Sequence, residues 1–368
     1  MKTGRNIWGL VWRLGLCGLL LLWIFHAIFL NEGRLALQKQ GLDWNQLDRA
    51  QQWQAAWTHG PRELWLTLRL VNPAAFALSV VLMGSTLLLG VLRWRMVLRV
   101  QGLDLPFVRA GEISLVAHFF NSFLLGSTGG DLMKAYYAAR ETHHKKTETV
   151  TAVFADRLIG LFSMLLFACL MMLPNRVLLF QHERLAAIAW LIVAMLLGCG
   201  LAVYLAFWGG LTKRWPAARD WFRKLPKGEM LERSLDSCRQ FGRHKTFLAE
   251  ALGLSMALNA LCVLQVLALA WGLGLAISPL ALFVMVPVII CISALPITPS
   301  GLGVRENLFV LMLAVPEVNV GETQALSLSL LAYAGSFIWS LIGGAVYVSL
   351  KESQHLAEVT GVDTPDNP

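Results

Sequence analysis

Charged residues are scarce in this chain of 368 residues, since Asp, Glu, Lys and Arg together make up 15% of it. Soluble domains carry about 25%, whereas hydrophobic residues here reach 56% and the mean hydropathy is +0.58. Several apolar runs approach the roughly 20 residues that a helix needs to cross a bilayer. The alternating pattern of a membrane barrel is missing from the sequence. We therefore expect an all-α integral membrane protein built as a polytopic helix bundle.

The signatures of several soluble activities are missing as well. The six cysteines form no CxxC pair and no cysteine–histidine cluster, so the sequence offers no pattern for a disulfide framework or a zinc site. The glycines near 301–303 lack the βαβ context of a dinucleotide fingerprint, and no nucleophile elbow is present. We expect no catalytic residue, no cofactor and no metal, and we favour a transporter over an enzyme.

Positive charge is the exception to this scarcity, and it falls between the apolar runs. The formal net charge is +8, yet no nucleic-acid-reading motif accompanies it, so we expect no nucleic-acid partner. Arg93 and Arg95 follow one apolar run, and ten Lys and Arg residues fill 209–246. By the positive-inside rule such loops are cytoplasmic. We interpret Arg93 and Arg95 as topology determinants that could also gather phosphate headgroups.

Six apolar runs are long enough to span a bilayer, and two others are interrupted. The interrupted runs are 110–125 and 279–315. If both dip into the membrane and return, every strongly basic loop lies on one side, whereas eight full spans would put one outside. We therefore predict about six spans plus two re-entrant segments in an inverted repeat, multi-pass in the cytoplasmic (inner) membrane, with both termini cytoplasmic. The six predicted spans are 8–30, 73–92, 152–173, 185–208, 247–272 and 326–350.

The predicted organisation is a single polytopic domain over 1–350. Segment 31–72 holds four tryptophans, a density typical of a membrane–water interface on the non-cytoplasmic side; an ordinary packed loop domain is the alternative. Residues 209–246 predict a basic amphipathic cytoplasmic loop that either contacts anionic headgroups or caps the bundle. The polar tail 351–368 is expected to be disordered.

Two glycine-rich breaks inside the short apolar runs carry the functional signal. Irregular backbone at membrane depth persists only inside protein or beside a water-filled cavity, and each charge at a helix centre costs about 2.5–3.5 kcal/mol. We therefore predict that both breaks and their charges line a substrate pathway. The first break comprises Asn121, Gly126, Gly129, Gly130, Asp131 and Lys134, and the second comprises Pro296, Pro299, Gly301, Gly303, Arg305 and Glu306.

Individual roles stay open at this level. Glycines before a helix expose N–H groups that attract anions, and Lys134 adds positive charge. Asp131 either caps that helix or handles substrate or protons, and Asn121 either satisfies the broken backbone or contacts a headgroup. Asp156 and Arg157, which open the next predicted span, are candidates for the same site.

Four motifs, in this order and spacing, resemble the membrane domain of lysylphosphatidylglycerol synthases. They are Arg93-Trp94-Arg95, 120–131, Asp156-Arg157 and 296–306, and the resemblance runs from about 8 to 350. The domain also occurs alone in a broad family of lipid flippases. The resemblance implies movement between leaflets of a lipid with a polar or phosphate-bearing headgroup, such as an aminoacyl-phospholipid or an isoprenoid-phosphate-linked glycan. It makes anionic or glycosylated membrane lipids the expected partners.

Some features depart from that family. Leu125 stands where the family usually has Pro, Lys134 often stands for Arg, and segment 31–72 is longer than expected. Because no soluble aminoacyl-transferring half follows the membrane domain, we do not expect lipid aminoacylation. Two alternatives to a flippase remain: an integral membrane glycosyl or lipid transferase, and a scaffold of cell-envelope biosynthesis whose basic loop recruits a biosynthetic enzyme.

Overall fold

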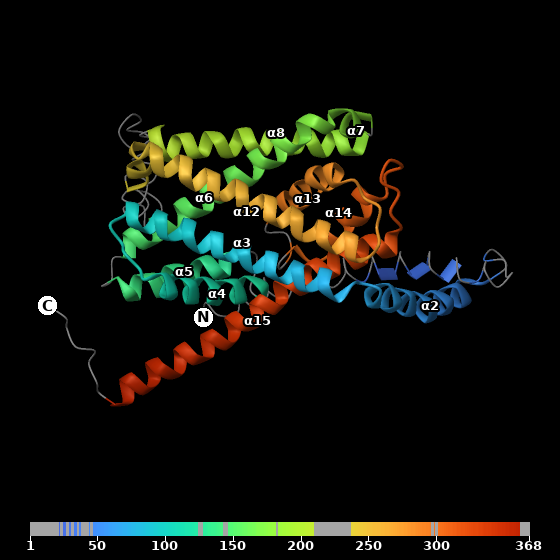
Figure 1. Cartoon of the computed structure of the whole chain (residues 1–368), viewed down its shortest axis with the longest axis horizontal. Helices are drawn as coiled ribbons and strands as arrows, with labels where there is room; N and C mark the ends of the chain where they lie inside the picture. Colours follow the sequence, from blue (N-terminus) through green and yellow to red (C-terminus); the bar gives the residue numbers. More distant parts are fainter. Residues whose placement is uncertain are drawn as a thin grey trace, which may run out of the picture.

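The structure is a bundle of long helices with two short helical hairpins inside it (Figure 1). This computed structural model describes scattered positions between 22 and 47, and then residues 48–123, 128–142, 146–181, 183–209, 237–295, 298 and 301–360, with the backbone alone for 351–360. Within that part, five helices are long and apolar enough to cross a membrane, which confirms an all-α polytopic membrane protein. They are α3 (Pro73–Val100), α6 (Lys146–Met172), α8 (Glu183–Tyr204), α12 (Lys245–Gly272) and α15 (Glu322–Thr360).

Several shorter elements connect these helices. Most of the predicted span 8–30 lies outside the described residues, although the described positions between 22 and 37 are helical. A 3-10 turn, Leu173–Asn175, and the short α7 (Arg176–Gln181) lead from α6 to α8, and a π-helical turn, Leu205–Gly209, ends α8. The predicted turn between the third and fourth runs is thus partly helical.

The four helices of the interrupted runs are too short to cross the bilayer. They are α4 (Phe107–Phe123), α5 (Thr128–Glu141), α13 (Pro279–Ser293) and α14 (Val304–Leu313). The longest has 17 residues, roughly 26 Å at 1.5 Å per residue, against a hydrocarbon core of about 30 Å. In Figure 1 the α4–α5 pair occupies one half of the bundle and the α13–α14 pair occupies the other. Each pair enters from its own end of the bundle and turns back near the middle, as re-entrant hairpins do.

The order of elements repeats with inverted direction. The first unit is α3, the α4–α5 hairpin and α6, and the second is α12, the α13–α14 hairpin and α15. The contacts between the units follow the same symmetry. Helix α3 packs against its counterpart α12. The α4 helix of the first unit packs against α15 of the second, and its counterpart α13 packs against α6 of the first. This packing is the arrangement expected of an inverted repeat.

Two spans begin or end elsewhere than predicted. Helix α3 continues past residue 92 to Val100, where Gly102 at φ +68° terminates it. Helix α6 begins at Lys146 rather than at residue 152. No proline or glycine lies in 93–100 or 146–151 to stop either helix. As a result Arg93 and Asp156, placed at helix ends by the sequence, lie well inside helices.

The segment before α3 forms a helix rather than a loop. Helix α2 (Arg49–Arg69) starts with a capping box in which the Asp48 carboxylate accepts a hydrogen bond from the Gln51 N–H. It lies at the end of the bundle opposite to the end where α3 finishes (Figure 1). Trp57 stacks with His26 and packs edge-on against Phe29. The interfacial location of this segment on the non-cytoplasmic side stays a prediction.

Of the predicted basic loop 209–246, residues 210–236 lie outside the described part. The described end of the loop, 237–243, is helical and carries Cys238 facing inward. Burial raises the pKa of the Cys238 thiol to about 12, so it stays protonated at neutral pH. The inward-facing Cys238 is consistent with the amphipathic character predicted for 209–246.

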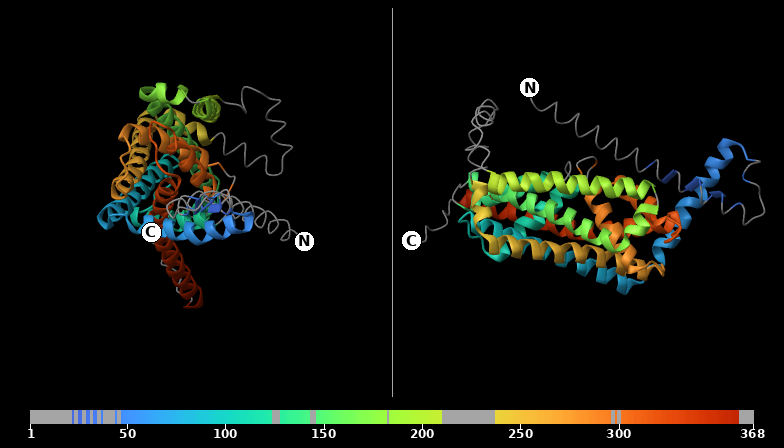
Figure 2. Two further views of the ribbon diagram at one scale, coloured as in Figure 1. Left: turned by 90° about the vertical axis from the view of Figure 1, so that its right-hand side faces the viewer. Right: turned by 90° about the horizontal axis from the view of Figure 1, so that it is seen from above.

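Helix α15 continues into the tail that we expected to be disordered. It reaches Thr360 and projects away from the bundle (Figures 1 and 2). The stretch 351–360 contains neither proline nor glycine, so nothing in it terminates the helix that leads into it. Residues 361–368 lie outside the described part.

Close packing of α4 on α15 depends on two glycines. A Cβ on Gly343 would overlap the Leu115 carbonyl oxygen, and a Cβ on Gly344 would press on the Phe119 ring. Small residues at such crossings let helix backbones approach each other in membranes. This contact joins the first hairpin to the last span of the second unit.

We predict opposite effects for two Gly→Ala substitutions in the long helices. Gly343→Ala forces α4 away from α15 and costs about 1–3 kcal/mol through overpacking, so it lowers the apparent Tm of the purified protein. Gly253→Ala has open space around its Cβ and leaves the Tm unchanged or raised, because Ala favours the helix. Thermal unfolding in detergent checks both, and an unchanged Tm for Gly343→Ala contradicts the proposed packing.

Candidate functional site

Two adjoining cavities lie between the hairpins, and together we call them the chamber. The first is about 470 Å³ and is lined by α3, α4, α5, α6, α12 and α13. The second is about 420 Å³ and lies against α13, α14 and α15. Residues beside the two breaks therefore face adjoining cavities. The two cavities share Met83, His118, Asn121, Cys262, Ile290 and Ala294.

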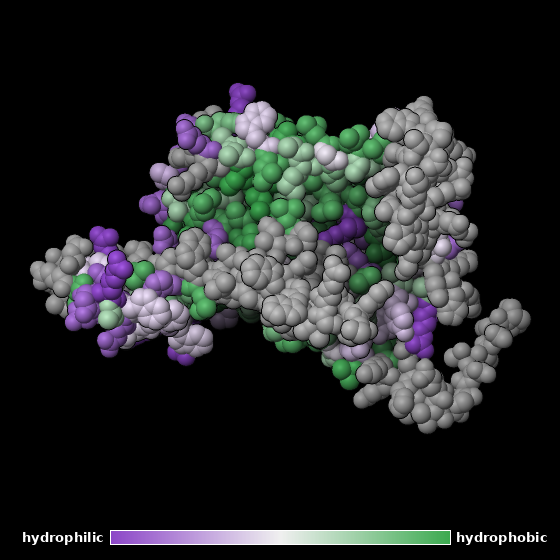
Figure 3. All heavy atoms as spheres, turned by 180° about the vertical axis from the view of Figure 1, so that it is seen from behind, coloured by the Kyte–Doolittle hydropathy of each residue, from purple (hydrophilic) through white to green (hydrophobic). Residues whose placement is uncertain are grey.

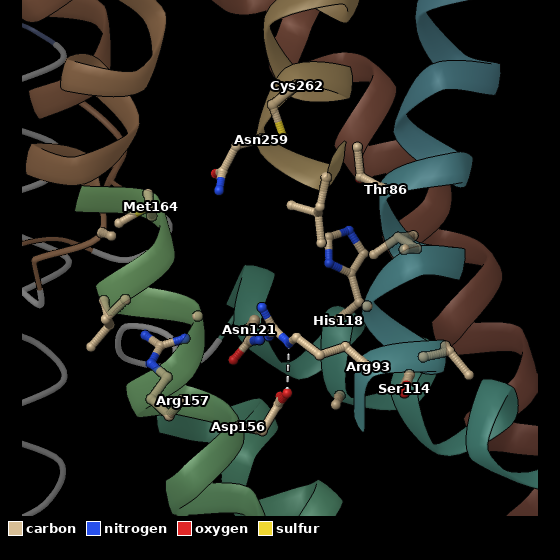
Figure 4. A pocket seen from close by; sticks show the side chains of 18 of the residues that line it. Thr86, Arg93, Ser114, His118, Asn121, Asp156, Arg157, Met164, Asn259 and Cys262 are labelled. Atoms are coloured by element: carbon tan, nitrogen blue, oxygen red, sulfur yellow. Dashed lines mark hydrogen bonds and ion pairs between the residues drawn. The ribbon is translucent and has the colours of Figure 1, made fainter. Parts of the chain in front are cut away.

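A network of buried charges forms the wall of the first cavity. Arg93 Nε donates to Asp156 Oδ1 at 2.8 Å (Figure 4), and Arg93 Nη1 donates to Ser255 Oγ at 3.0 Å. Lys134 Nζ lies 3.9 Å from the other Asp156 oxygen and 4.9 Å from the centre of the Trp94 ring. One carboxylate thus neutralises cations from two other helices, which ties α3, α5 and α6 together.

A second ion pair lies in the same cavity. Arg157 Nε is 3.8 Å from Asp131 Oδ2, and both side chains line the first cavity. Across this wall three cations, Arg93, Lys134 and Arg157, face the two carboxylates of Asp131 and Asp156, which leaves one positive charge in excess. Low-dielectric surroundings strengthen the field of such an excess. The cavity is therefore suited to an anionic group.

The first break is held by a side chain rather than by regular helix. Asn121 Oδ1 accepts a hydrogen bond from the Gly130 N–H at 2.8 Å, which satisfies one of the free donors at the start of α5. A Cβ on Gly130 would overlap the Ala117 carbonyl oxygen and the Asn121 side chain. Of the two roles open to Asn121, the structure shows the backbone one. Asp131, in the first turn of α5, pairs with Arg157.

The second break is built around Glu306, which is fully buried. Its Oε2 accepts a hydrogen bond from the Gly303 N–H at 2.6 Å, and its Oε1 accepts from Ser329 Oγ at 3.4 Å and from Arg305 Nη2. Gly303 has φ +83°, a left-handed conformation that glycine adopts without strain. Glu306 thus caps α14 and neutralises its neighbour, and it is not among the residues that line the two cavities.

Arg305 is the charge of the second break that reaches the cavity. Its Nε donates to Ser329 Oγ at 3.2 Å, and its guanidinium lies 4.6 Å from the centre of the Tyr333 ring. Both partners come from α15, so this side chain links the second hairpin to the last span. With Glu306 beside it, the second cavity is close to neutral.

The structure sorts the predicted site residues into three groups. Gly129, Gly130, Gly303 and Glu306 lie behind the wall, where they shape the breaks. Gly126, Pro296 and Pro299 lie outside the described residues. The residues that line the chamber are Asn121, Asp131, Lys134, Asp156, Arg157, Gly301 and Arg305.

Other chamber residues were not among the predicted site residues. Arg93 was interpreted as a topology determinant that could also gather phosphate headgroups, because the predicted span ended at residue 92, one position before it. His118 lies at the junction of the two cavities, and its Nε2 is 3.1 Å from the Ser336 carbonyl oxygen. Asn259 and Gln265 are amides inside an apolar span. Polar side chains inside apolar runs were the signal that could have identified His118, Asn259 and Gln265.

Removing the Asp156 charge tests the central network. Asp156→Asn leaves Arg93 and Lys134 without their shared carboxylate, and breaking a buried pair costs about 3–5 kcal/mol. The control is Asp104→Asn, because Asp104 pairs with Arg99 in an exposed position, where the expected cost is about 0–1 kcal/mol. Thermal unfolding compares the two variants. Equal Tm values would show that the network contributes nothing to stability.

Comparison with known proteins agrees with this architecture. Two proteins of Methanothermobacter thermautotrophicus, each named UPF0104 membrane protein, are 26% and 24% identical to this chain; the alignments cover 75% and 72% of this chain and 83% and 82% of theirs. Residues 52–344 match the family described as the lysylphosphatidylglycerol synthase TM region. That match includes every described residue that lines the chamber, and the chain belongs to the lysylphosphatidylglycerol synthase TM region family.

Proposed function

We propose that this protein moves a lipid with an anionic, phosphate-bearing headgroup between the leaflets of the cytoplasmic membrane. The observation that carries the proposal is the chamber, where a positively charged cavity lies between two hairpins that enter from opposite ends of the bundle. The chain belongs to a family whose description refers to the membrane region of lysylphosphatidylglycerol synthase, and this supports a lipid as the substrate class.

The chamber lowers the barrier that the bilayer sets against headgroup movement. A charged group in hydrocarbon loses its hydration at high cost. Arg93, Lys134 and Arg157 replace that hydration by offering N–H donors to the phosphate, while the Asn259 amide offers a neutral partner. The acyl chains stay in the bilayer, since only the headgroup needs the polar route.

The inverted repeat supplies a means of exposing the chamber to either side. In transporters with such repeats, the two units exchange conformations around a site near the bilayer midplane. Here the hairpins occupy equivalent places in the two units, so an exchange of their arrangements moves access from one end of the bundle to the other. No binding of nucleotide is required by this scheme, and a lipid gradient or an ion gradient drives it.

Orientation follows from the distribution of basic residues. Helix α3 ends and helices α4, α6 and α12 begin at one end of the bundle, which we call the basic end because Arg95, Arg99, Arg109 and Arg140 belong to it. The positive-inside rule places the basic end in the cytoplasm. Helix α15 finishes at that end, so the C-terminal side of the chain is cytoplasmic as well.

Lipid movement is measured with the purified full chain in vesicles. Trace NBD-labelled phosphatidylglycerol, phosphatidylethanolamine or a short polyprenyl phosphate is added, and dithionite then reports the label that reaches the outer leaflet, with and without a pH gradient. We expect at least one of these lipids to move at least tenfold faster than in protein-free vesicles. If none of the three moves faster, the proposed function is wrong.

Loss of one chamber charge should slow that movement. Lys134→Gln removes a cation from the cavity wall, and we expect the rate to fall by about tenfold, the effect of losing roughly 1.4 kcal/mol of stabilisation. Arg140→Gln on the same helix removes a charge that is exposed at the basic end, and the rate should stay within twofold of the unmodified protein. Equal rates for the two variants would remove Lys134 from the pathway.

A further inference from the structure

Among the charges that line the first cavity, the two most exposed lie at the border between α5 and α6. Asp131 on α5 and Arg157 on α6 pair across this border, and their side chains are 29% and 36% exposed. The inner charges, Arg93, Lys134 and Asp156, are only 10–17% exposed. We call the border between these two helices the first seam.

Apolar side chains border the first seam on its outer side. On α5, Leu132 is 70% exposed, and Tyr136 is exposed one turn further along. On α6, Val150 and Phe154 are exposed and also lie four residues apart, so each pair shares one helix face. Figure 3 shows that hydrophobic side chains cover much of the flank of the bundle seen in that view. The seam therefore combines an apolar rim, which suits lipid tails, with a polar interior, which suits a headgroup.

The equivalent border in the second unit, between α14 and α15, is more buried than the first seam. There Arg305 is 16% exposed and Glu306 is 0% exposed, and Arg305 is held by Ser329 and Tyr333 of α15. Two ion pairs cross the first seam, Arg157–Asp131 at 3.8 Å and Lys134–Asp156 at 3.9 Å, and the outer of the two, Arg157–Asp131, is partly exposed and therefore weak. The two units are thus alike in fold and unlike in closure.

We propose that the first seam is the lateral entrance through which a lipid headgroup reaches the chamber from the half of the bilayer next to the basic end. This inference rests on the proposed function and specifies its route. Arg157 is the first contact: it exchanges the Asp131 carboxylate for the anionic group of the headgroup. The anion then advances to Lys134 and Arg93, while its acyl chains remain along Leu132 and Phe154. The second seam is closed in this state and opens when the units exchange conformations.

A reversible staple across the seam tests the entrance. Asp131→Cys and Arg157→Cys are combined in a chain whose native cysteines are replaced, and a short bis-thiosulfonate joins the two thiols. We expect stapling to reduce NBD-lipid movement at least tenfold and dithiothreitol to restore it. The matched control staples Arg109→Cys to Glu141→Cys, which joins α4 to α5 where the native side chains lie 2.6 Å apart, and leaves the rate within twofold.

The outcomes separate the entrance from the function. If the unmodified protein moves no lipid, the proposed function is wrong. If the protein moves lipid and stapling the first seam does not slow it, the entrance lies elsewhere and the inference fails while the function stands.

A second measurement uses the unmodified protein, in case the cysteine pair is itself inactive. Phosphatidylglycerol with a diazirine on its headgroup is photolysed in nanodiscs with the full chain, and labelled peptides are identified. We expect labelling of α5 and α6 peptides at least fivefold above α14 and α15 peptides, because only the first seam admits a headgroup in this state. Equal labelling of both seams, or stronger labelling of the second, overturns the inference.

Discussion

The Asp156 carboxylate is the interaction on which the arrangement of this bundle depends. Three helices meet at it, since Arg93 comes from α3, Lys134 from α5 and Asp156 itself from α6. A single charge inside a membrane bundle is costly unless a partner neutralises it. Each of these residues is therefore tolerated at its depth only because the other two are present. The same network that holds the first hairpin against its unit also supplies the positive wall of the cavity.

In both breaks a side chain satisfies a glycine N–H at the start of a helix, but the side chains differ. The first uses a side chain from the preceding helix, Asn121, to satisfy the backbone of α5. The second uses the carboxylate of Glu306, inside its own helix, to satisfy Gly303. Because Glu306 is saturated by its local partners, it adds no free charge to the chamber. The positive excess therefore belongs to the first unit alone, although the fold of the two units is alike.

The sequence was sufficient for the fold class, the five described spans and both re-entrant hairpins, because apolar run length and basic loops report directly on membrane crossing. It was less informative about helix ends. No proline or glycine lies between residue 92 and Val100 to end the helix. The predicted span ended at the first arginine, so Arg93 was assigned to a loop although it lies inside α3. The role of Glu306 could not be predicted either, since a cap and a substrate contact use the same carboxylate. Distances between helices decide such cases, and they depend on packing that one sequence does not reveal.

The two units share a fold but differ in side-chain contacts, and this difference decides from which side a headgroup can enter the chamber. A transporter whose two seams were equally closed would trap its chamber, and one whose seams were equally open would leak. In this structure Arg305 of the second seam is held by Ser329 and Tyr333 of α15, whereas the outer side of the first seam is held by the longer Asp131–Arg157 pair. The difference lies in how strongly the outermost contact resists an entering headgroup. A lipid anion that replaces Asp131 at Arg157 breaks the outer ion pair of the first seam, so binding itself shifts the balance between the two seams.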